Sequence, residues 1–488
     1  MILAIDQGTT GTTCVVYDEH AQPVGHAYRE LAQSFPSPGW VEHDPLEIWL
    51  ATQALAGEAL ADAAVASAQL TAVGITNQRE TVCVWDPASG EPLHSAIVWQ
   101  DRRTAGRCEQ LRTAGVEPLL RSRTGLVLDP YFSATKMQWL LENVPGLRRR
   151  AEQGTAVFGT IDSWLAFKLT GEHVTDPSNA ARTLLYDITA GRWDPELLEL
   201  FGIPERSLAR VCPSTGVIGM TDPLTLHGHS VPLAGIAGDQ QAALFGQACV
   251  EAGMGKNTYG TGSFVLLNAG ASPPEPTSGL LSTVAWGLGQ QLTYALEASI
   301  FVTGAAVQWL RDGLSIIERA SDSETLARTL DGNDGVYFVP ALTGLGSPHW
   351  DPHARGTIVG LTRGSSRAHI ARAALEAIAY QTVDAVRAME SACRSPLKEL
   401  RADGGATGNE WLMQFQADVL GVPVVLPHIT ETTSLGAAYL AGVGVGLWSV
   451  PEVRANWRER ARYEPRMSAD ERESLLEGWH RALERARG

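Results

Sequence analysis

The chain has 488 residues, so two domains are expected, because one hydrophobic core rarely serves more than about 250–300 residues. Hydrophobic residues make up 44% of the chain and charged residues 19%, which is ordinary for a soluble globular protein. The formal net charge of −16 argues against nucleic-acid binding and against binding to anionic membranes, since both need a basic surface.

The cysteines and the apolar runs indicate the compartment. Six cysteines are scattered along the chain, at Cys14, Cys83, Cys108, Cys212, Cys249 and Cys393. None forms a C-x-x-C pair, so no zinc or redox motif is predicted, and isolated thiols suit a reducing compartment. The first residues show no charged leader, and the weakly polar run 436–448 is too short and too rich in glycine to span a bilayer. We expect a cytoplasmic protein without membrane insertion.

The N-terminal stretch predicts a β-hairpin with a polar turn. Residues 2–5 and 14–17 are apolar, and a loop rich in Gly and Thr joins them. Backbone N–H groups in such a turn form an anion site, and an acid such as Asp6 beside it is explained if Mg²⁺ accompanies phosphates. Asp6 with Gly8, Thr9 and Thr10 is therefore either a magnesium-nucleotide clamp or a plain turn, and this stretch alone favours the turn.

A helix is predicted to begin next. Asp44 is the expected N-cap, Pro45 suits the first turn, and Glu47 stands at the reciprocal position of a capping box. Residues 73–75 and 82–85 predict further strands, so strands and helices are mixed. Such a mixture indicates an α/β fold.

Two polar clusters follow strand-like runs. Arg79 and Glu80 form either an exposed ion pair, or a donor and an acceptor for a polyol, whose hydroxyls need both. Asp239 follows the apolar run 231–237 and either faces a ligand crevice at the end of a strand or caps a helix.

The second half of the chain repeats the hairpin pattern. NTYGTGSFVLLN at 257–268 again places a Gly-Thr turn before an apolar run, and DGGATGN at 403–409 is a third glycine-rich turn. A long helix is expected at about 366–389, and Ser468 with Glu471 predicts the capping box of a final helix. The repeated hairpin indicates an internal duplication, with a domain boundary near residue 247 and the ligand between the halves.

The order of these motifs resembles the FGGY carbohydrate kinase family, within the actin/hexokinase-like ATPases, and in particular its glycerol-phosphorylating members. The resemblance runs through nearly the whole chain. It rests on DQGTT at 6–10, PGWVEHDP at 38–45, TNQRET at 76–81, IVWQDRRT at 97–104, TGLVLDPYFSATK at 124–136, GIAGDQQAALFGQ at 235–247, KNTYGTGSF at 256–264, ALTGLGSPHWD at 341–351 and DGGATGN at 403–409.

The resemblance implies an α/β fold of two actin-like (ribonuclease H-like) domains with a catalytic cleft between them. The N-terminal domain would span 1–247, with the polyol site and the first phosphate loop, and the nucleotide-binding C-terminal domain 248–488. The implied reaction is ATP-dependent phosphorylation of glycerol to sn-glycerol 3-phosphate, with ATP and Mg²⁺ as cofactors. A homodimer or homotetramer is also implied.

The resemblance also assigns residues. Asp239 would be the general base and a second contact to the metal, and Asp6 would lie in the outer shell of Mg²⁺. The residues expected to bind glycerol are Arg79, Glu80, Tyr131, Asp239 and Gln240, with Trp99 and Phe264 as aromatic walls. The residues expected to bind the nucleotide are Thr9, Thr10, Gly11, Gly260, Thr261, Gly262, Gly304, Gln308, Gly405 and Asn409.

Two departures from the family pattern have consequences. Thr13 stands where members commonly carry an arginine close to the phosphates, and we expect ATP binding to survive on the backbone amides and Mg²⁺. The segment 222–230, DPLTLHGHS, carries no arginine, so inhibition by a sugar bisphosphate is not expected. Some relatives are phosphorylated on a loop histidine, and His227 and His229 lie either in such a loop or in an ordinary surface loop.

Three alternatives remain open at this stage. Another polyol or ketose kinase of the same family would act on xylulose, erythritol or glycerone. A non-catalytic sugar-sensing repressor on the same scaffold would need an added helix-turn-helix. An actin-like filament protein would leave Arg79, Glu80 and Tyr131 without a role.

Overall fold

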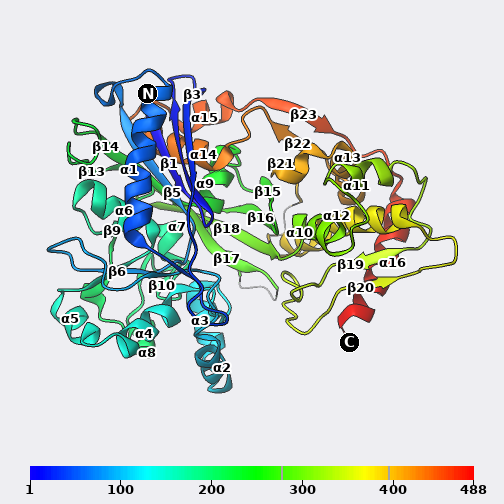
Figure 1. Ribbon diagram of the computed structural model, residues 1–488, viewed down its shortest axis with the longest axis horizontal. Coiled ribbons are helices and arrows are strands. Elements are labelled where there is room, and N and C mark those ends of the chain that lie inside the picture. The colour runs from blue at the N-terminus through cyan, green and yellow to red at the C-terminus, as the bar shows by residue number, and fades with distance from the viewer. Residues whose placement is uncertain (276–278, 394–395, 488) are drawn as a thin grey trace.

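The computed structural model describes residues 1–275, 279–393 and 396–487 and contains two lobes, each built on a mixed β-sheet (Figure 1). The first sheet has the order β13 (Thr215–Met220), β14 (Pro232–Gly238), β5 (Ala72–Asn77), β1 (Ile2–Gln7), β2 (Gly11–Tyr17) and β3 (Pro23–Glu30). The second has the order β17 (Leu281–Leu288), β18 (Gln291–Ile300), β16 (Ser263–Gly270), β15 (Gly255–Tyr259), β21 (Leu400–Gly404), β22 (Val424–Pro427) and β23 (Glu459–Tyr463).

The two sheets share a pairing pattern. β1 pairs antiparallel with β2 and parallel with β5, and β5 pairs parallel with β14. In the second sheet β15 pairs antiparallel with β16 and parallel with β21, and β21 pairs parallel with β22. Both predicted Gly-Thr hairpins are confirmed, and they occupy matching places at the carboxyl edge of parallel strands, as a duplication requires.

Helices cover both faces of the first sheet. α1 (Pro45–Asp62) and α6 (Ile161–Thr170) pack on one face, where Leu3, Ile5 and Val73 meet Ile48 and Leu55. α9 (Asp239–Gly246) and α14 (Thr432–Gly444) cover the other face. One apolar cluster joins this face to α9, α14 and the second sheet, so these two helices form the centre of the molecule.

The capping prediction for α1 is half right. Asp44 caps the helix, because its Oδ1 accepts from the backbone N–H of Leu46 at 2.8 Å, and Pro45 opens the first turn. The prediction that Glu47 accepts from the backbone N–H of Asp44 is wrong. The Glu47 carboxylate accepts instead from the backbone N–H of Ala32 at 3.4 Å, because the chain that leaves β3 brings that donor alongside the first turn.

α9 and α14 approach each other through glycines. A Cβ built on Gly436 would lie 1.8 Å from the carbonyl oxygen of Ala242, and one on Gly246 would lie 1.9 Å from that of Thr432. Real Cβ atoms do not come so close to backbone atoms, so the crossing admits only hydrogen at both positions.

The second lobe packs its helices on the far face of its sheet. The long helix predicted at 366–389 is α12 (Arg367–Cys393), and it packs with α13 (Glu410–Leu420) and α16 (Ala469–Arg487) around one apolar cluster. Ser468 accepts from the backbone N–H of Glu471 at 3.2 Å, which is one of the two hydrogen bonds of the capping box predicted at the N-terminus of α16.

Smaller elements complete the lobes. Other helices are α2 (Ala105–Thr113), α3 (Glu117–Thr124), α4 (Ser133–Asn143), α5 (Leu147–Gln153), α7 (Pro177–Ala180), α8 (Pro195–Phe201), α10 (Gly304–Gln308), α11 (Asp322–Ala327) and α15 (Val450–Asn456). Short strands pair in small ladders: β4 (Glu42–His43) with β7 (Ala96–Ile97), β6 (Cys83–Trp85) with β8 (Val157–Gly159), β9 (Val174–Thr175) with β12 (Arg210–Val211), β10 (Tyr186–Asp187) with β11 (Arg192–Trp193), and β19 (Tyr337–Val339) with β20 (Thr357–Val359).

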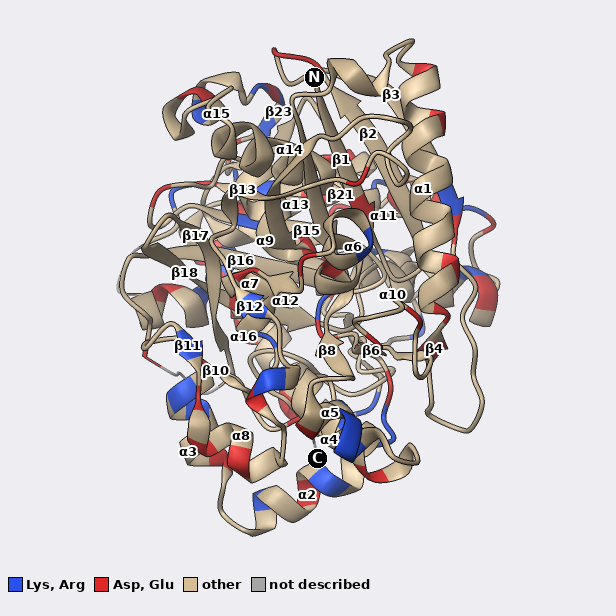
Figure 2. Ribbon diagram, turned by 90° about the vertical axis from the view of Figure 1, so that its left-hand side faces the viewer, with Lys and Arg blue, Asp and Glu red and all other residues tan. Residues whose placement is uncertain are grey.

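Acidic and basic residues are mixed along the chain. Figure 2 shows the two kinds interspersed along the ribbon in this view. Among the helices that the structure describes, none has the length and apolar character needed to cross a bilayer.

Asp384 of α12 ties the C-terminal helix to the second lobe. Its carboxylate accepts from the indole Nε1 of Trp479 at 2.7 Å and lies 3.0 Å from Nε2 of His480. The hydrogen bond to Asp384 raises the pKa of His480 above its ordinary value. Burial raises the pKa of Asp384, but hydrogen bonds from His349, His480 and Trp479 outweigh it and hold that pKa low.

We expect the replacement His480→Gln to lower the thermal midpoint more at pH 5.5 than at pH 8.5. A histidine with a raised pKa stabilises the fold fully below its unfolded value, about 6.5, and this contribution is lost as the pH rises through the folded value. Calorimetry at the two pH values measures it, with the exposed His20→Gln as control. An equal loss at both pH values would contradict the pairing.

Candidate active site

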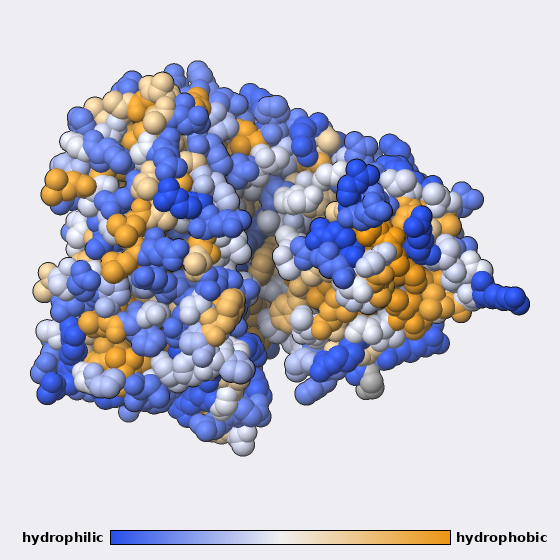
Figure 3. Space-filling view, viewed as in Figure 1, coloured by the Kyte–Doolittle hydropathy of each residue, from blue (hydrophilic) through white to orange (hydrophobic). Residues whose placement is uncertain are grey.

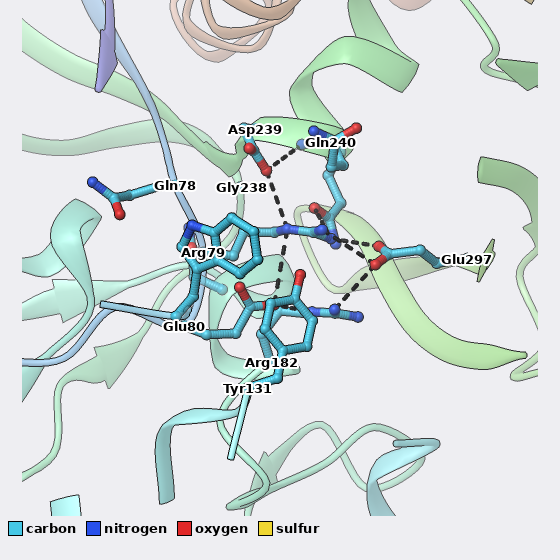
Figure 4. A network of polar contacts seen from close by, with 12 residues as sticks. Gln78, Arg79, Glu80, Tyr131, Arg182, Gly238, Asp239, Gln240 and Glu297 are labelled. Carbon is cyan, nitrogen blue, oxygen red and sulfur yellow. Dashed lines mark hydrogen bonds and ion pairs between the residues drawn. The ribbon is translucent and has the colours of Figure 1, made fainter. Parts of the chain in front are cut away.

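The carboxyl edge of the first sheet gathers the predicted polar residues. Asp6 lies near the end of β1, Arg79 and Glu80 follow β5, and Asp239 follows β14 as the first residue of α9. Parallel strands end at one edge, which in open α/β sheets is where ligands bind. Figure 3 shows a deep groove between the two lobes, and Figure 4 shows Arg79 extended between Asp239 and Glu297.

Asp239 is held through one carboxylate oxygen. Nε of Arg79 lies 3.1 Å from Oδ1 of Asp239, and the backbone N–H of Gln240 donates to the same oxygen at 2.7 Å. The Asp239 side chain is 29% exposed, whereas that of Arg79 is 2% exposed. Within the described residues Oδ2 has no hydrogen-bond partner, so one oxygen is available to a ligand.

Arg79 and Glu80 belong to a closed ring of four buried charges, which we call the ion ring. Arg79 donates from Nη1 and Nη2 to Glu297, at 2.5 and 3.2 Å. Arg182 donates to Glu80 at 2.6 Å and to Glu297 at 3.1 Å, and Nε of Arg79 lies 4.0 Å from Glu80. The side chains of all four residues are at most 2% exposed, so the exposed-ion-pair alternative for Arg79 and Glu80 is wrong.

Burial and the neighbouring arginines act in opposite directions on the two glutamates of the ring. Burial raises the pKa of Glu297, but Arg182 and Arg79 outweigh it and lower that pKa to about 2. Burial also raises the pKa of Glu80, and the two arginines offset this only in part. A buried ion pair is retained only where each partner is compensated, and here each glutamate faces both arginines.

Glu80 also carries backbone strain. Its φ of 63° lies in the left-handed region, which a residue with a long side chain rarely adopts. Such strain costs about 1–3 kcal/mol and persists where the surroundings impose it, most often at functional sites.

Aromatic side chains surround the ion ring. The rings of Trp99 and Tyr131 meet edge to face at 5.4 Å, and the guanidinium of Arg79 lies 5.8 Å from the ring of Phe264. The buried Lys136 fixes the loop that carries Tyr131, because its ammonium donates to the carbonyls of Pro130, Tyr131 and Phe132, at 2.9, 2.6 and 2.9 Å. The structure thus places one predicted aromatic wall, Phe264, against Arg79 and the other, Trp99, against Tyr131.

The first Gly-Thr loop is fixed from both sides. Gly8 donates its backbone N–H to the carbonyl of Gly11 at 2.9 Å, and Gln78 donates from Nε2 to the carbonyl of Gly8 at 3.1 Å. The indole of Trp99 donates to Oγ1 of Thr9 at 2.8 Å, which joins the aromatic wall to this loop. Thr10 at the tip is exposed.

The second Gly-Thr loop packs against the start of α10. Gly304 donates its backbone N–H to the carbonyl of Gly260 at 3.1 Å, and a Cβ at Gly304 would lie 2.6 Å from that oxygen. Gly260 and Thr261 are exposed. A bare backbone turn of this kind can approach a phosphate closely.

Asp6 has the environment of a cation ligand. It is half-buried, and burial together with Asp239 and Glu431 raises its pKa to about 8. The described residues contain no group of three or more His, Cys, Asp or Glu side chains placed to bind a metal directly. Protein Mg²⁺ sites commonly use one or two carboxylates with phosphates and water, so Asp6 and Asp239 fit a Mg²⁺ site in which Asp6 lies in the outer shell.

Comparison with known proteins identifies the family. Residues 1–246 match the N-terminal domain, and residues 255–445 the C-terminal domain, of the FGGY family of carbohydrate kinases. The chain belongs to this FGGY family. The α/β fold of two kinase domains predicted from the sequence is thereby confirmed, while the exact boundary after residue 247 stays a prediction.

Relatives match this FGGY kinase over its full length. It is 57% identical to a glycerol kinase of Dechloromonas aromatica, over 99% of this chain and 97% of the relative, and 55% identical to one of Deinococcus radiodurans, over 100% and 97%. The crystal structure of Plasmodium falciparum glycerol kinase with ADP superposes with a TM-score of 0.95 at 36% identity, covering 99% and 98% of the two chains. A xyloylose kinase from Brucella ovis superposes at 0.88 with 26% identity, covering 99% and 97%.

The other residues expected at the nucleotide of this FGGY kinase lie in the second lobe. Gly405 begins the turn after β21, and Asn409 caps α13, since its Oδ1 accepts from the backbone N–H of Leu412 at 2.9 Å. Gln308 is exposed at the end of α10. Contact of these residues with a nucleotide stays a prediction.

Sequence reasoning missed several polar residues of the site. Arg182 and Glu297 complete the ion ring, and Lys256 donates to Oε1 of Gln240 at 2.5 Å and to Oγ1 of Thr258 at 2.8 Å. The sequence around Glu297 did not single it out, because a carboxylate between the apolar Leu296 and Ala298 also fits the solvent-facing position of an alternating strand.

Proposed function

We propose that this chain catalyses the ATP-dependent phosphorylation of glycerol to sn-glycerol 3-phosphate in glycerol catabolism. The observation that carries the proposal is Asp239, a carboxylate with one available oxygen, which is held by Arg79 at the end of β14, on the same edge of the sheet as the first Gly-Thr loop. Full-length relatives named glycerol kinase, 54–57% identical to this chain, support the choice of acceptor.

Each residue has a role in this proposal. Asp239 accepts the proton from a terminal hydroxyl of glycerol, as a carboxylate base does in phosphoryl transfer. Arg79, Glu80, Tyr131 and Gln240 bind the other hydroxyls. Trp99 and Phe264 pack against the carbon chain and exclude water, which would otherwise compete as the acceptor.

The two loops would bind the nucleotide. The first loop contributes Thr9, Thr10 and Gly11 from the first lobe, and the second contributes Gly260, Thr261 and Gly262 from the second lobe, to which Gly304, Gln308, Gly405 and Asn409 also belong. Asp6 would hold the outer shell of Mg²⁺, with Asp239 as a second contact. Mg²⁺, when bound with ATP, neutralises charge on the β- and γ-phosphates. Thr13 supplies no charge here, so the phosphates depend on backbone N–H groups and the metal.

A substrate panel tests the proposal. Purified protein is given ATP and Mg²⁺ with glycerol, glycerone, erythritol or xylulose, and release of ADP is measured by a coupled assay. We expect the highest kcat/KM for glycerol and no turnover after removal of Mg²⁺ with EDTA. A higher kcat/KM for xylulose would favour the ketose kinases, with which the fold is shared.

Location and assembly are the finer parts of the proposal. We place the protein in the cytoplasm, where ATP is available, and expect a homodimer or homotetramer. Sedimentation at several protein concentrations measures the assembly, and a single monomeric species throughout would overturn that part alone.

A further inference from the structure

The ion ring joins the two lobes. Arg79 follows β5 of the first sheet, whereas Glu297 lies in β18 of the second sheet, 218 residues away in sequence. Arg182 follows the short helix α7 and bridges Glu297 to Glu80 (Figure 4). Arg79 and Glu80, which are predicted to bind the acceptor, are thus held by Glu297 and Arg182, two residues outside the predicted site.

We propose that Glu297 and Arg182 are positioning residues, Glu297 for Arg79 and Arg182 for Glu80 and Tyr131, and that they set how the acceptor is presented to Asp239. The inference rests on the proposed function, because it concerns the same acceptor site. Neither residue touches the acceptor, and both act through their neighbours in the ion ring.

Glu297 determines which nitrogen of Arg79 faces Asp239. It occupies both terminal nitrogens of the guanidinium, and Oε1 of Gln241 accepts from Nη1 as well, at 3.3 Å. Only Nε then points to Asp239, and it contacts one oxygen. Without the charge of Glu297, the terminal nitrogens are free to turn to Glu80 or to Asp239, and a two-bond pair with Asp239 would occupy the oxygen that the acceptor needs.

Arg182 holds the acceptor side of the ring. Its Nε donates to Oε1 of Glu80, whose backbone is strained, and its guanidinium lies 5.6 Å from the ring of Tyr131 and 5.2 Å from that of Phe132. In the part of the chain that is described, its buried Nη1 has no hydrogen-bond partner, so the guanidinium is held by the ring charges and these aromatic faces. Removal of Arg182 would release Glu80 and Tyr131 together.

The charges suggest a balanced set of variants. The ring contains two positive and two negative groups, so Glu297→Gln or Arg182→Gln alone leaves an uncompensated buried charge, while the double variant removes one of each sign. Glu297→Asp keeps the negative charge but shortens the side chain. Arg182→Lys keeps the positive charge but removes the planar guanidinium with its several donors.

A matched control exists in α12. Glu376 is buried, accepts from Nε of Arg372 at 2.8 Å and also accepts from Tyr380 and Asn333. Glu376→Gln therefore removes the carboxylate that faces a buried arginine, as Glu297→Gln does, but at a pair that lies outside the ion ring.

The experiment compares kcat and KM for glycerol with the thermal midpoint of each variant, and measures glycerol binding by calorimetry. We expect Glu297→Gln to lower kcat by about 10²-fold, the size of a 1 Å misplacement, and Glu297→Asp to recover part of it. Arg182→Gln and Arg182→Lys should raise the KM for glycerol by about 10-fold or more, with a smaller change in kcat, as expected when binding shared by ground and transition state is lost. The double variant should fold and keep the raised KM.

Glu376→Gln should lose stability with kcat and KM unchanged. The proposal is overturned if the ring variants change only the thermal midpoint, as this control does, or if the double variant restores wild-type kcat and KM. If Glu297→Gln does not fold, the double variant and Arg182→Lys decide the question. Turnover of glycerol by the wild-type protein tests the proposed function separately. If the wild type prefers another acceptor from the panel, the kcat and KM of the ring variants are compared with those of the wild type on that acceptor.

Discussion

Replacement of Asp239 with asparagine is expected to lower kcat by about 10²-fold or more, the usual contribution of a general base. Asparagine keeps the shape of the side chain and its contact with Arg79, but it cannot accept the proton of the acceptor hydroxyl. Steady-state kinetics with glycerol and ATP measure the effect, and the KM for glycerol should change much less than kcat.

Asp44→Asn is the matched control for this variant. Asp44 also stands at the N-terminus of a helix, is exposed, and accepts one backbone N–H, a role in which asparagine is equivalent. Its kcat should equal that of the wild type. If Asp239→Asn also stays within a factor of two of the wild type, Asp239 is not the base.

Replacement of Gly436 with alanine is expected to destabilise the protein by about 3 kcal/mol, because overpacking a close-packed core costs 1–3 kcal/mol and here the obstacle is helix backbone rather than a side chain. The added Cβ would meet the carbonyl of Ala242 in α9. Relief requires α9 and α14 to move apart, and Asp239 is the first residue of α9. We therefore also expect kcat to fall by about 10-fold or more.

Thermal unfolding and kinetics of the same preparation measure both effects. Gly106→Ala in α2 is the control, because a Cβ there meets nothing within 4 Å. It should leave kcat unchanged and add up to about 1 kcal/mol of stability. A wild-type thermal midpoint in Gly436→Ala would mean that α9 and α14 do not cross at these glycines.

Local patterns in the sequence were sufficient to predict the hairpins. The strand of residues 2–5 extends to Gln7 as β1, and that of residues 14–17 begins at Gly11 as β2. Turn chemistry and apolar runs act over a few residues, so a single sequence contains them. The capping hydrogen bond predicted for Glu47 was wrong because its actual partner, the backbone N–H of Ala32, lies outside the helix and its local pattern.

The ion ring could not be predicted from sequence spacing. Arg182 lies 115 residues from Glu297, and the partners meet only because two sheets face each other across α9 and α14. Arg79 and Glu80 were found because they stand together in a motif, whereas Arg182 and Glu297 stand in apolar surroundings. A charged residue in a buried run indicates that a partner exists, but not which one.

The position of α14 was missed although its composition indicated a buried helix. Its residues, TTSLGAAYLAGVG, are apolar or small on every side, which is typical of a helix surrounded by protein. What no local pattern shows is that it covers the sheet formed by the first strands of the chain.

This crossing sets an order of events during synthesis. The strands of the first sheet are complete at residue 238, but the helix that covers one of its faces begins at Thr432. At about 5–20 residues per second, the ribosome needs about 10–40 s to add the intervening residues. Throughout that interval the nascent N-terminal half presents an apolar sheet face to its surroundings, so we expect chaperone binding to be strongest there and to end when α14 emerges.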